Sequence, residues 1–137
     1  MLVNILCIDD DPIVEYYVKA LVKKSGIADT FNWVSDGQKG LEYLEKCIDK
    51  THIPPQVFPA LILLDLNMPV MNGWQFLEEY AVKFAPLFPK TKIVIVSSSI
   101  DKDDIDKSTA YSFVMDYISK PVTVVALTGL QNKWEHA

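Results

Sequence analysis

Short apolar runs alternate with longer amphipathic stretches along this chain. The apolar runs are residues 3–8, 30–34, 61–64, 92–96 and a short one around Tyr117 and Ile118. Their length and their content of Val, Ile and Leu predict β-strands. Because the runs are rich in large apolar residues on both faces, they are typical of a sheet that is covered by helices on both sides.

The stretches between these runs have the periodicity of amphipathic helices. After Asp11, Pro12 stands where the first turn of a helix tolerates proline, and an apolar stripe continues to Ser25 and Gly26. The stripe consists of Ile13, Val14, Tyr17, Val18, Leu21 and Val22. The other four predicted helices span residues 40–48, 74–84, 103–113 and 122–134. Five successive strand–helix units predict an α/β fold, a (βα)₅ pattern with a doubly wound parallel sheet.

The composition narrows the range of partners. The 137 residues predict one domain, 1–137, and 50% hydrophobic content is sufficient for a buried core. The chain has 18 acidic and 13 basic side chains, a formal charge of −5, and every basic residue is a lysine. Surfaces that bind nucleic acid are basic and rely on arginine, so we expect no nucleic-acid partner.

The same sequence predicts neither a membrane span nor a secreted product. No run approaches the roughly 20 apolar residues that a membrane helix needs, and residues 1–8 lack the basic start of a signal peptide. Cys7 and Cys47 have no paired spacing of the zinc or redox kind, and Cys7 falls in an apolar run that predicts a core position. We therefore expect a reduced, cytoplasmic domain.

One connection is unusually long. Residues 47–59 carry Pro54, Pro55 and Pro59 and join the second predicted helix to the third strand. The segment is either a flap that contacts a partner or a surface insertion that the fold tolerates, and the second interpretation is favoured because loops accept insertions at small cost.

Polar residues follow the predicted strands at the positions where a parallel sheet binds ligands. Outside the carboxyl ends of the strands lie Asp9, Asp10 and Asp11 after the first, Asp65 after the third, Ser97 after the fourth and Lys120 after the fifth. Acids from different strands are thus expected to face one crevice together with a hydroxyl and an amine.

This set of groups predicts magnesium and phosphoryl chemistry. Carboxylates that are brought together repel each other unless a proton or a cation lies between them, and oxygen ligands suit Mg²⁺. With Mg²⁺ in place, an oxygen of Asp65 can act as a nucleophile on phosphorus. Lys120 and the Ser97 hydroxyl can then hold the oxygens of the transferred phosphoryl group.

Each of these residues also has a structural explanation when it is taken alone. The run Asp9 to Asp11 can cap a helix, Asp65 can stabilise a turn, Ser97 can begin a loop, and Lys120 can be a solvated surface lysine. The chemical interpretation is favoured because four strand ends would otherwise have to carry complementary groups by chance.

Four motifs in the right order resemble the response regulator receiver domain of two-component signalling. They are ILCIDDDP at residues 5–12, LLDLNMPVMNG at 63–73, VIVSSS at 94–99 and YISKP at 117–121. The resemblance covers residues 3–134 and is closest to stand-alone members of the chemotaxis type. It implies a flavodoxin-like strand order 2-1-3-4-5.

The resemblance also implies roles for particular residues. Asp65 matches the phosphoacceptor, Asp10 a direct Mg²⁺ ligand, Asp9 an acid that acts on Mg²⁺ largely through water, and Asn67 the position whose backbone carbonyl completes the ligand set. Ser97 and Tyr117 match the switch pair, and Lys120 matches the phosphate-binding lysine, with a cis bond to Pro121. Asp11 has no ligand role and is expected to start the first helix.

The implied function is a phosphorelay switch. The donor would be a phosphohistidine on a sensor histidine kinase or a histidine phosphotransfer protein. The new charge at Asp65 would draw Ser97 inward, let Tyr117 rotate, and alter the surface of the fourth helix, fifth strand and fifth helix, where a downstream protein or a second copy could bind. Because the chain ends soon after the predicted fifth helix, we expect a stand-alone regulator without an output domain.

Three other classes compete with this interpretation. A haloacid-dehalogenase-type phosphatase would have a second acid two residues after its nucleophile, where this chain has Asn67. A flavodoxin-like electron carrier would have a phosphate-cradling loop after the first strand, where this chain has three aspartates. A degenerate receiver that only binds proteins would be expected to lose the acids or Lys120.

Overall fold

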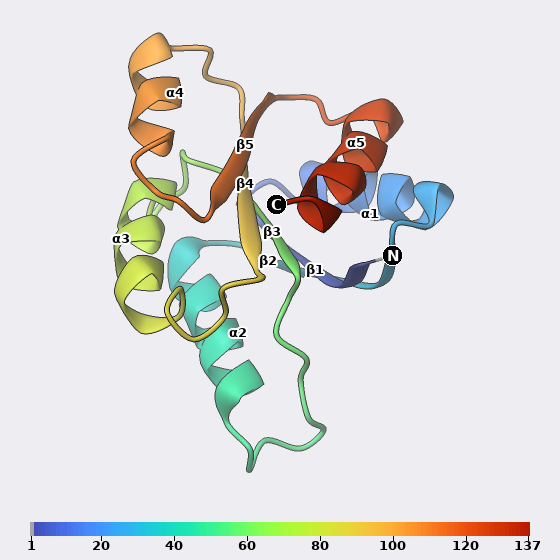
Figure 1. Ribbon diagram of the computed structural model, residues 1–137, viewed down its shortest axis with the longest axis vertical. Coiled ribbons are helices and arrows are strands. Elements are labelled where there is room, and N and C mark those ends of the chain that lie inside the picture. Colours follow the sequence, from blue (N-terminus) through green and yellow to red (C-terminus); the bar gives the residue numbers. More distant parts are fainter. Residues whose placement is uncertain (1) are drawn as a thin grey trace.

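A five-stranded parallel sheet forms the centre of the molecule (Figure 1). The computed structural model describes residues 2–137, apart from the side chain of Val3, and within that range the strand order is β2-β1-β3-β4-β5. The strands are β1 (Leu2–Ile8), β2 (Ala28–Val34), β3 (Leu61–Leu64), β4 (Lys92–Ser97) and β5 (Val114–Ser119). This order confirms both the predicted fold class and the topology that the resemblance implied.

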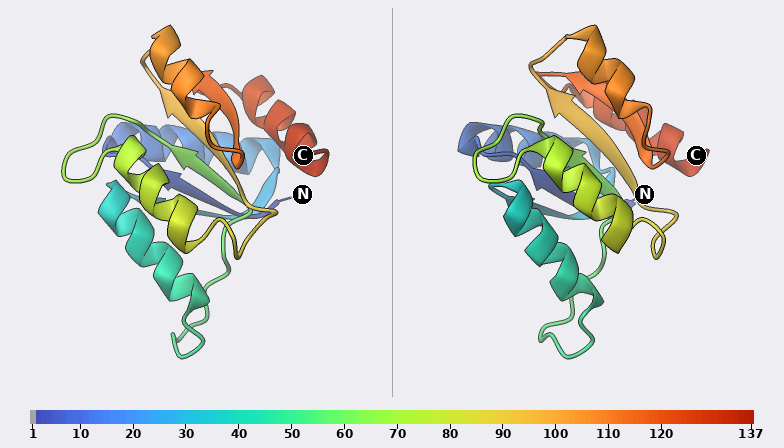
Figure 2. Two further views of the ribbon diagram at one scale, coloured as in Figure 1. Left: turned by 60° about the vertical axis from the view of Figure 1, so that its left-hand side comes forward. Right: turned by 90° about the vertical axis from the view of Figure 1, so that its left-hand side faces the viewer.

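Helices cover both faces of the sheet. They are α1 (Pro12–Ser25), α2 (Gly37–Ile48), α3 (Gly73–Lys83), α4 (Lys102–Ser108) and α5 (Val124–Glu135). Figures 1 and 2 show α1 and α5 on one face and α2, α3 and α4 on the other. Among residues 2–137, no helix is both long and apolar enough to cross a membrane.

Alternate side chains of each inner strand enter two separate apolar layers. On β1, Ile5 and Cys7 pack with α1 and α5, whereas Leu6 and Ile8 pack with α2 and α3. All four residues of β3 are buried, as a central strand between two helical layers requires. The predicted core position of Cys7 is confirmed, because its side chain is buried.

Helix α1 begins and ends as its sequence predicts. The Asp11 side chain accepts a hydrogen bond from the Ile13 N–H and so caps the helix, and Pro12 follows in the first turn. At the other end, Gly26 adopts φ 67°, a left-handed conformation that glycine accepts without a steric penalty. The apolar stripe is only half buried, however, because Ile13 is 74% exposed.

Two predicted boundaries on the α4–β5 side are wrong. The helix expected over residues 103–113 ends at Ser108, and β5 starts at Val114, before the expected Tyr117. The apolar residues Tyr111 and Phe113 imitate a helical stripe, but they belong to the turn that leads into β5. Their rings pack against each other, and Phe113 also packs against Tyr80 of α3.

The other boundaries differ from the predictions by a few residues. β2 begins at Ala28, and α2 begins at Gly37 because the Asp36 side chain caps it by accepting from the Lys39 N–H. Ser97 is the last residue of β4, not the first residue after it.

The long connection between α2 and β3 is fixed to the sheet at its base. The side-chain amide of the buried residue Asn4 donates to the Val57 carbonyl at 2.9 Å, and the Thr91 hydroxyl donates to the Pro59 carbonyl at 2.7 Å. The loop extends beyond the end of α2 (Figure 1), and Ile53 within it is 88% exposed. A role as a flap or as a tolerated insertion stays a prediction.

Candidate functional site

Three carboxylates meet beyond the carboxyl ends of β1 and β3. Asp9 follows β1 directly and Asp65 follows β3, and the Asp65 N–H donates to the Ile8 carbonyl at 2.9 Å, which sets the two acids side by side. One carboxylate oxygen from each of Asp9, Asp10 and Asp65 lies within 4.8 Å of the others. Asp9 and Asp65 are buried, while Asp10 is exposed.

Lys120, which directly follows β5, brings a positive charge to these acids. Its backbone N–H donates to the Ser97 carbonyl at 2.9 Å, which holds the residue at the end of β4. Its ammonium nitrogen lies 2.8 Å from Asp9 Oδ2 and 3.6 Å from Asp65 Oδ1. The expected cis bond between Lys120 and Pro121 is present.

The charges in this crevice are unevenly compensated. Burial and the neighbouring charge of Asp9 raise the pKa of Asp65 to about 6, although Lys120 acts in the opposite direction. Burial alone would lower the pKa of Lys120, but its hydrogen bond to Asp9 and the charges of Asp9 and Asp65 outweigh burial and raise it. Lys120 therefore stays protonated, and one lysine does not neutralise three acids.

The backbone around the acids fixes their orientation. The Asp11 N–H donates to Asp9 Oδ1 at 3.0 Å, so both oxygens of the Asp9 carboxylate have partners within the chain. The Asn67 N–H approaches Asp65 Oδ1 at 3.5 Å. Gly73, the first residue of α3, packs so closely behind the site that a Cβ atom there would lie 2.5 Å from the Asp65 carbonyl oxygen.

The two expected switch residues lie on the neighbouring strands. Ser97 is fully buried, and its hydroxyl oxygen accepts a hydrogen bond from the Ser99 N–H at 3.1 Å. The Tyr117 hydroxyl on β5 donates to the Ser99 carbonyl at 2.9 Å. Both predicted residues therefore contact Ser99, for which the sequence predicts no role.

The acidic crevice fits a hard divalent cation. Carboxylate oxygens that lie within 4.8 Å of one another can bind one ion together, and the negative charge that Lys120 leaves uncompensated favours it. Asp10 is exposed and Asp65 has one oxygen in contact with Lys120, so both offer oxygens to such an ion. The carbonyl ligand expected from Asn67 stays a prediction.

Comparison with known proteins gives the family. The family model described as the response regulator receiver domain matches residues 5–130. The chain belongs to this family. A crystal structure of a two-component response regulator from Cytophaga hutchinsonii is similar at a TM-score of 0.88 and 29% identity, over 99% of this chain and 98% of that one.

Two curated relatives that are named as response regulators are similar to this receiver domain. The nitrate/nitrite response regulator protein NarL of Escherichia coli strain K12 is 34% identical over 74% of this chain and 41% of its own length. The probable C4-dicarboxylate response regulator DctR of Halalkalibacterium halodurans is 28% identical over 98% of this chain and 52% of its own length. The chain thus spans about half or less of the length of these two relatives.

The chain is therefore a receiver domain of the kind found in response regulators of two-component signalling. Receiver domains are phosphoacceptor signalling domains that bind Mg²⁺ at an acidic pocket, and they interact with histidine kinases or phosphotransfer proteins and with downstream targets. In this chain, Asp9, Asp10 and Asp65 form an acidic cluster.

Proposed function

We propose that Asp65 accepts a phosphoryl group from a phosphohistidine on a partner protein. One observation carries the proposal: the Asp65 carboxylate is buried at the end of β3, beside the charges of Asp9 and Lys120. A carboxylate oxygen attacks phosphorus, a P–O bond forms, and the P–N bond to the donor imidazole breaks. The leaving imidazole nitrogen takes a proton from solvent.

The residues around Asp65 stabilise the charge that moves in this step. Because the pKa of Asp65 is about 6, the carboxylate is ionised and nucleophilic at neutral pH. Lys120 lies 3.6 Å from Asp65 and is positioned to neutralise the oxygens of the arriving phosphoryl group. The Ser97 hydroxyl, which accepts from Ser99, still has its own proton to donate to one of these oxygens.

A bound Mg²⁺ would neutralise the negative charge between the Asp65 carboxylate and the incoming phosphoryl oxygens. Asp10, Asp65 and the carbonyl of Asn67 would hold the ion, and Asp9 would act on it largely through water. The two partners that Asp9 already has, the Asp11 N–H and Lys120, support this indirect role. The same groups would serve when the chain catalyses its own dephosphorylation, in which water replaces the donor as the reaction partner.

The phosphoryl group would then act as a switch for protein contacts. Movement of the Ser97 hydroxyl toward the new charge changes its contact with Ser99, and Tyr117 is bonded to the same residue. The surface formed by α4, β5 and α5 is thereby altered, and it is where a downstream protein or a second copy of the chain would bind. The acidic, arginine-free composition supports an output through protein contacts over nucleic acid.

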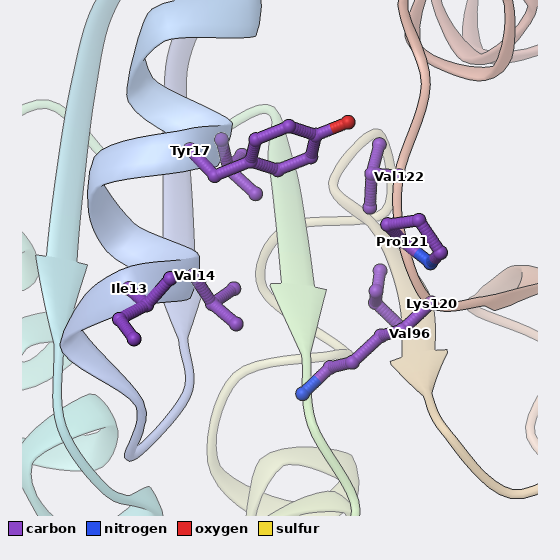
Figure 3. A pocket seen from close by; sticks show the side chains of 8 residues that line it. Ile13, Val14, Tyr17, Val96, Lys120, Pro121 and Val122 are labelled. Atoms are coloured by element: carbon purple, nitrogen blue, oxygen red, sulfur yellow. The ribbon is translucent and has the colours of Figure 1, made fainter.

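An apolar groove beside Lys120 suits the histidine-bearing donor (Figure 3). It encloses about 310 Å³ between α1 and the segment that follows β5. Its lining includes Ile13, Val14 and Tyr17 of α1 together with Lys120, Pro121 and Val122. Because Lys120 belongs to both the groove and the acidic site, a donor helix that places apolar side chains here would bring its histidine next to Asp65.

Both cysteines lie in the described range and are free thiols, which is consistent with the proposed cytoplasmic location of the chain and its partner.

Incubation with acetyl phosphate and Mg²⁺ tests the proposed reaction. The intact chain should gain the mass of one phosphoryl group, and the gain should disappear in Asp65→Asn or when the metal is chelated. Asp29→Asn, which changes an exposed aspartate on β2, is the matched control and should be phosphorylated normally. Phosphorylation of Asp65→Asn at the rate of the unmodified chain would refute the assignment.

A further inference from the structure

Ser99 is hydrogen bonded to three different parts of the fold. Its backbone N–H donates to the Ser97 hydroxyl oxygen at 3.1 Å, and its carbonyl accepts from the Tyr117 hydroxyl at 2.9 Å. Its own hydroxyl donates to Asp104 Oδ2 at 3.0 Å and accepts from the Asp101 N–H at 3.2 Å. One residue thus connects the end of β4, the middle of β5 and the first turn of α4.

Helix α4 depends on such contacts because it buries little surface of its own. Of its seven residues, all within the described part of the chain, Ser108 alone is buried. The helix lies at the edge of its layer, beside β5 (Figure 2). A short helix with so few buried side chains gains little from packing, so hydrogen bonds to its first turn contribute much of what holds it in place.

We propose that Ser99 is a positioning residue that couples the Ser97 hydroxyl at the phosphoryl site to the first turn of α4 through Asp104. The coupling rests on the proposed function, because it needs a phosphoryl group on Asp65. A hydroxyl group can accept one hydrogen bond while it donates another. Ser97 can therefore donate to a phosphoryl oxygen and still accept the hydrogen bond from the Ser99 N–H. When the Ser97 oxygen moves toward Asp65, it draws Ser99 with it, and the hydroxyl of Ser99 transmits the displacement to Asp104.

The chain contains its own reporter of the position of α4. The Lys107 ammonium lies 4.4 Å from the ring centroid of Trp74, so the surroundings of this α3 side chain depend on where α4 sits. Lys107 lies one turn after Asp104 on the same helix. Of the other two tryptophans, Trp33 on β2 lies outside the surface formed by α4, β5 and α5 and serves as the internal reference.

The test uses the full chain labelled with 5-fluorotryptophan, which gives one ¹⁹F resonance for each tryptophan, with Trp74 assigned from Trp74→Phe. Each spectrum is recorded before and after treatment with acetyl phosphate and Mg²⁺, and intact mass gives the phosphorylated fraction of the same sample. The Trp74 resonance of the unmodified chain should move. Lys107→Gln removes the charge through which α4 acts on the Trp74 ring. The decrease that this substitution causes in the Trp74 chemical-shift change therefore measures the contribution of α4.

Ser99→Ala and Asp104→Ala should be phosphorylated to the same extent as the unmodified chain but should lose about half or more of the Trp74 movement. The double variant should lose no more than either single one, because both substitutions remove the same contact. Ser99→Thr keeps a hydroxyl and should restore the movement. Asp103→Ala, which changes the neighbouring exposed acid in the same turn, is the matched control and should respond fully.

The outcomes separate this coupling from the reaction on which it rests. Full phosphorylation with an undiminished Trp74 movement in both Ser99→Ala and Asp104→Ala would overturn the coupling and leave the proposed function intact. Failure of the unmodified chain to be phosphorylated would overturn the proposed function and the coupling together. Additive losses in the double variant would also contradict a single shared contact.

Discussion

The Lys120 ammonium lies 2.8 Å from Asp9 Oδ2, closer than it lies to the proposed phosphoacceptor. The Asp9 side chain is almost fully buried, and this lysine stabilises its charge together with the Asp11 N–H. This ion pair holds the ammonium beside Asp65 before any phosphoryl group arrives. The entropy of ordering the Lys120 side chain therefore does not add to the activation barrier.

Substitution of Lys120 by alanine should slow phosphorylation by acetyl phosphate by about 100-fold, as loss of one donor to a developing oxyanion typically does. It should also lower the free energy of unfolding by about 1–3 kcal/mol, because the buried Asp9 charge loses its partner. Rates of mass gain and urea titrations measure the two effects.

Lys133→Ala is the matched control for that change, since Lys133 pairs with Asp116 on an exposed part of the surface. It should leave the rate unchanged and alter stability by less than about 1 kcal/mol. Equal phosphorylation rates in the two variants would contradict the role given to Lys120.

Asp65→Asn should stabilise the metal-free chain in a pH-dependent manner. In the folded chain the pKa of Asp65 is about 6, above its ordinary value, so the folded state binds more protons than the unfolded state between about pH 4 and 6. The stability of the unmodified chain therefore falls as the pH rises through this window.

The free energy of unfolding of Asp65→Asn should not fall in this way. Its excess over that of the unmodified chain should grow from near zero at about pH 4 to about 1–3 kcal/mol at about pH 7. Urea titrations at several pH values with a chelator present measure it. Added Mg²⁺ should reduce the advantage, and a difference that stays constant with pH would contradict the electrostatic cause.

Asp10→Asn should weaken Mg²⁺ binding by at least about tenfold, because it removes one of the three clustered carboxylates. Trp74, which follows the first residue of α3, provides a fluorescence signal for the titration. Asp11→Asn is the control, since Asp11 caps α1 and asparagine caps a helix as well. Identical Mg²⁺ affinities in the two variants would remove Asp10 from the ligand set.

Gly73→Ala should destabilise the chain by about 1–3 kcal/mol and slow phosphorylation, because the new methyl group would displace the Asp65 backbone. Gly129→Ala lies within α5, where, among the described residues, nothing beyond the adjacent residues and helix backbone comes within 4 Å of the new Cβ, and it should instead stabilise the chain by about 0.5–1 kcal/mol. Thermal unfolding of both variants tests the sign of each effect. If Gly73→Ala left the unfolding temperature unchanged, the backbone around Asp65 would accommodate the methyl group without loss of stability, which would contradict this prediction.

The convergence of Asp9, Asp65 and Lys120 could be predicted from sequence because parallel strands end at one edge of a sheet. That rule places side chains at an edge but does not decide which charges pair, so the contact of Lys120 with Asp9 required the structure.

The predicted end of α4 was wrong for a related reason. Phe113 continues a helical apolar period, and its actual partner, Tyr80, is distant in sequence.

The most direct test of the central claim is to identify the phosphorylated residue after treatment with acetyl phosphate and Mg²⁺. Borohydride converts a phosphoaspartate to homoserine, and cleavage after lysine yields a peptide of residues 51–83 in which Asp65 is the only aspartate. Mass spectrometry should find the change at Asp65 within this peptide. A change at Asp9, Asp10 or Asp11 in the first peptide, or no change in any peptide, would contradict the account.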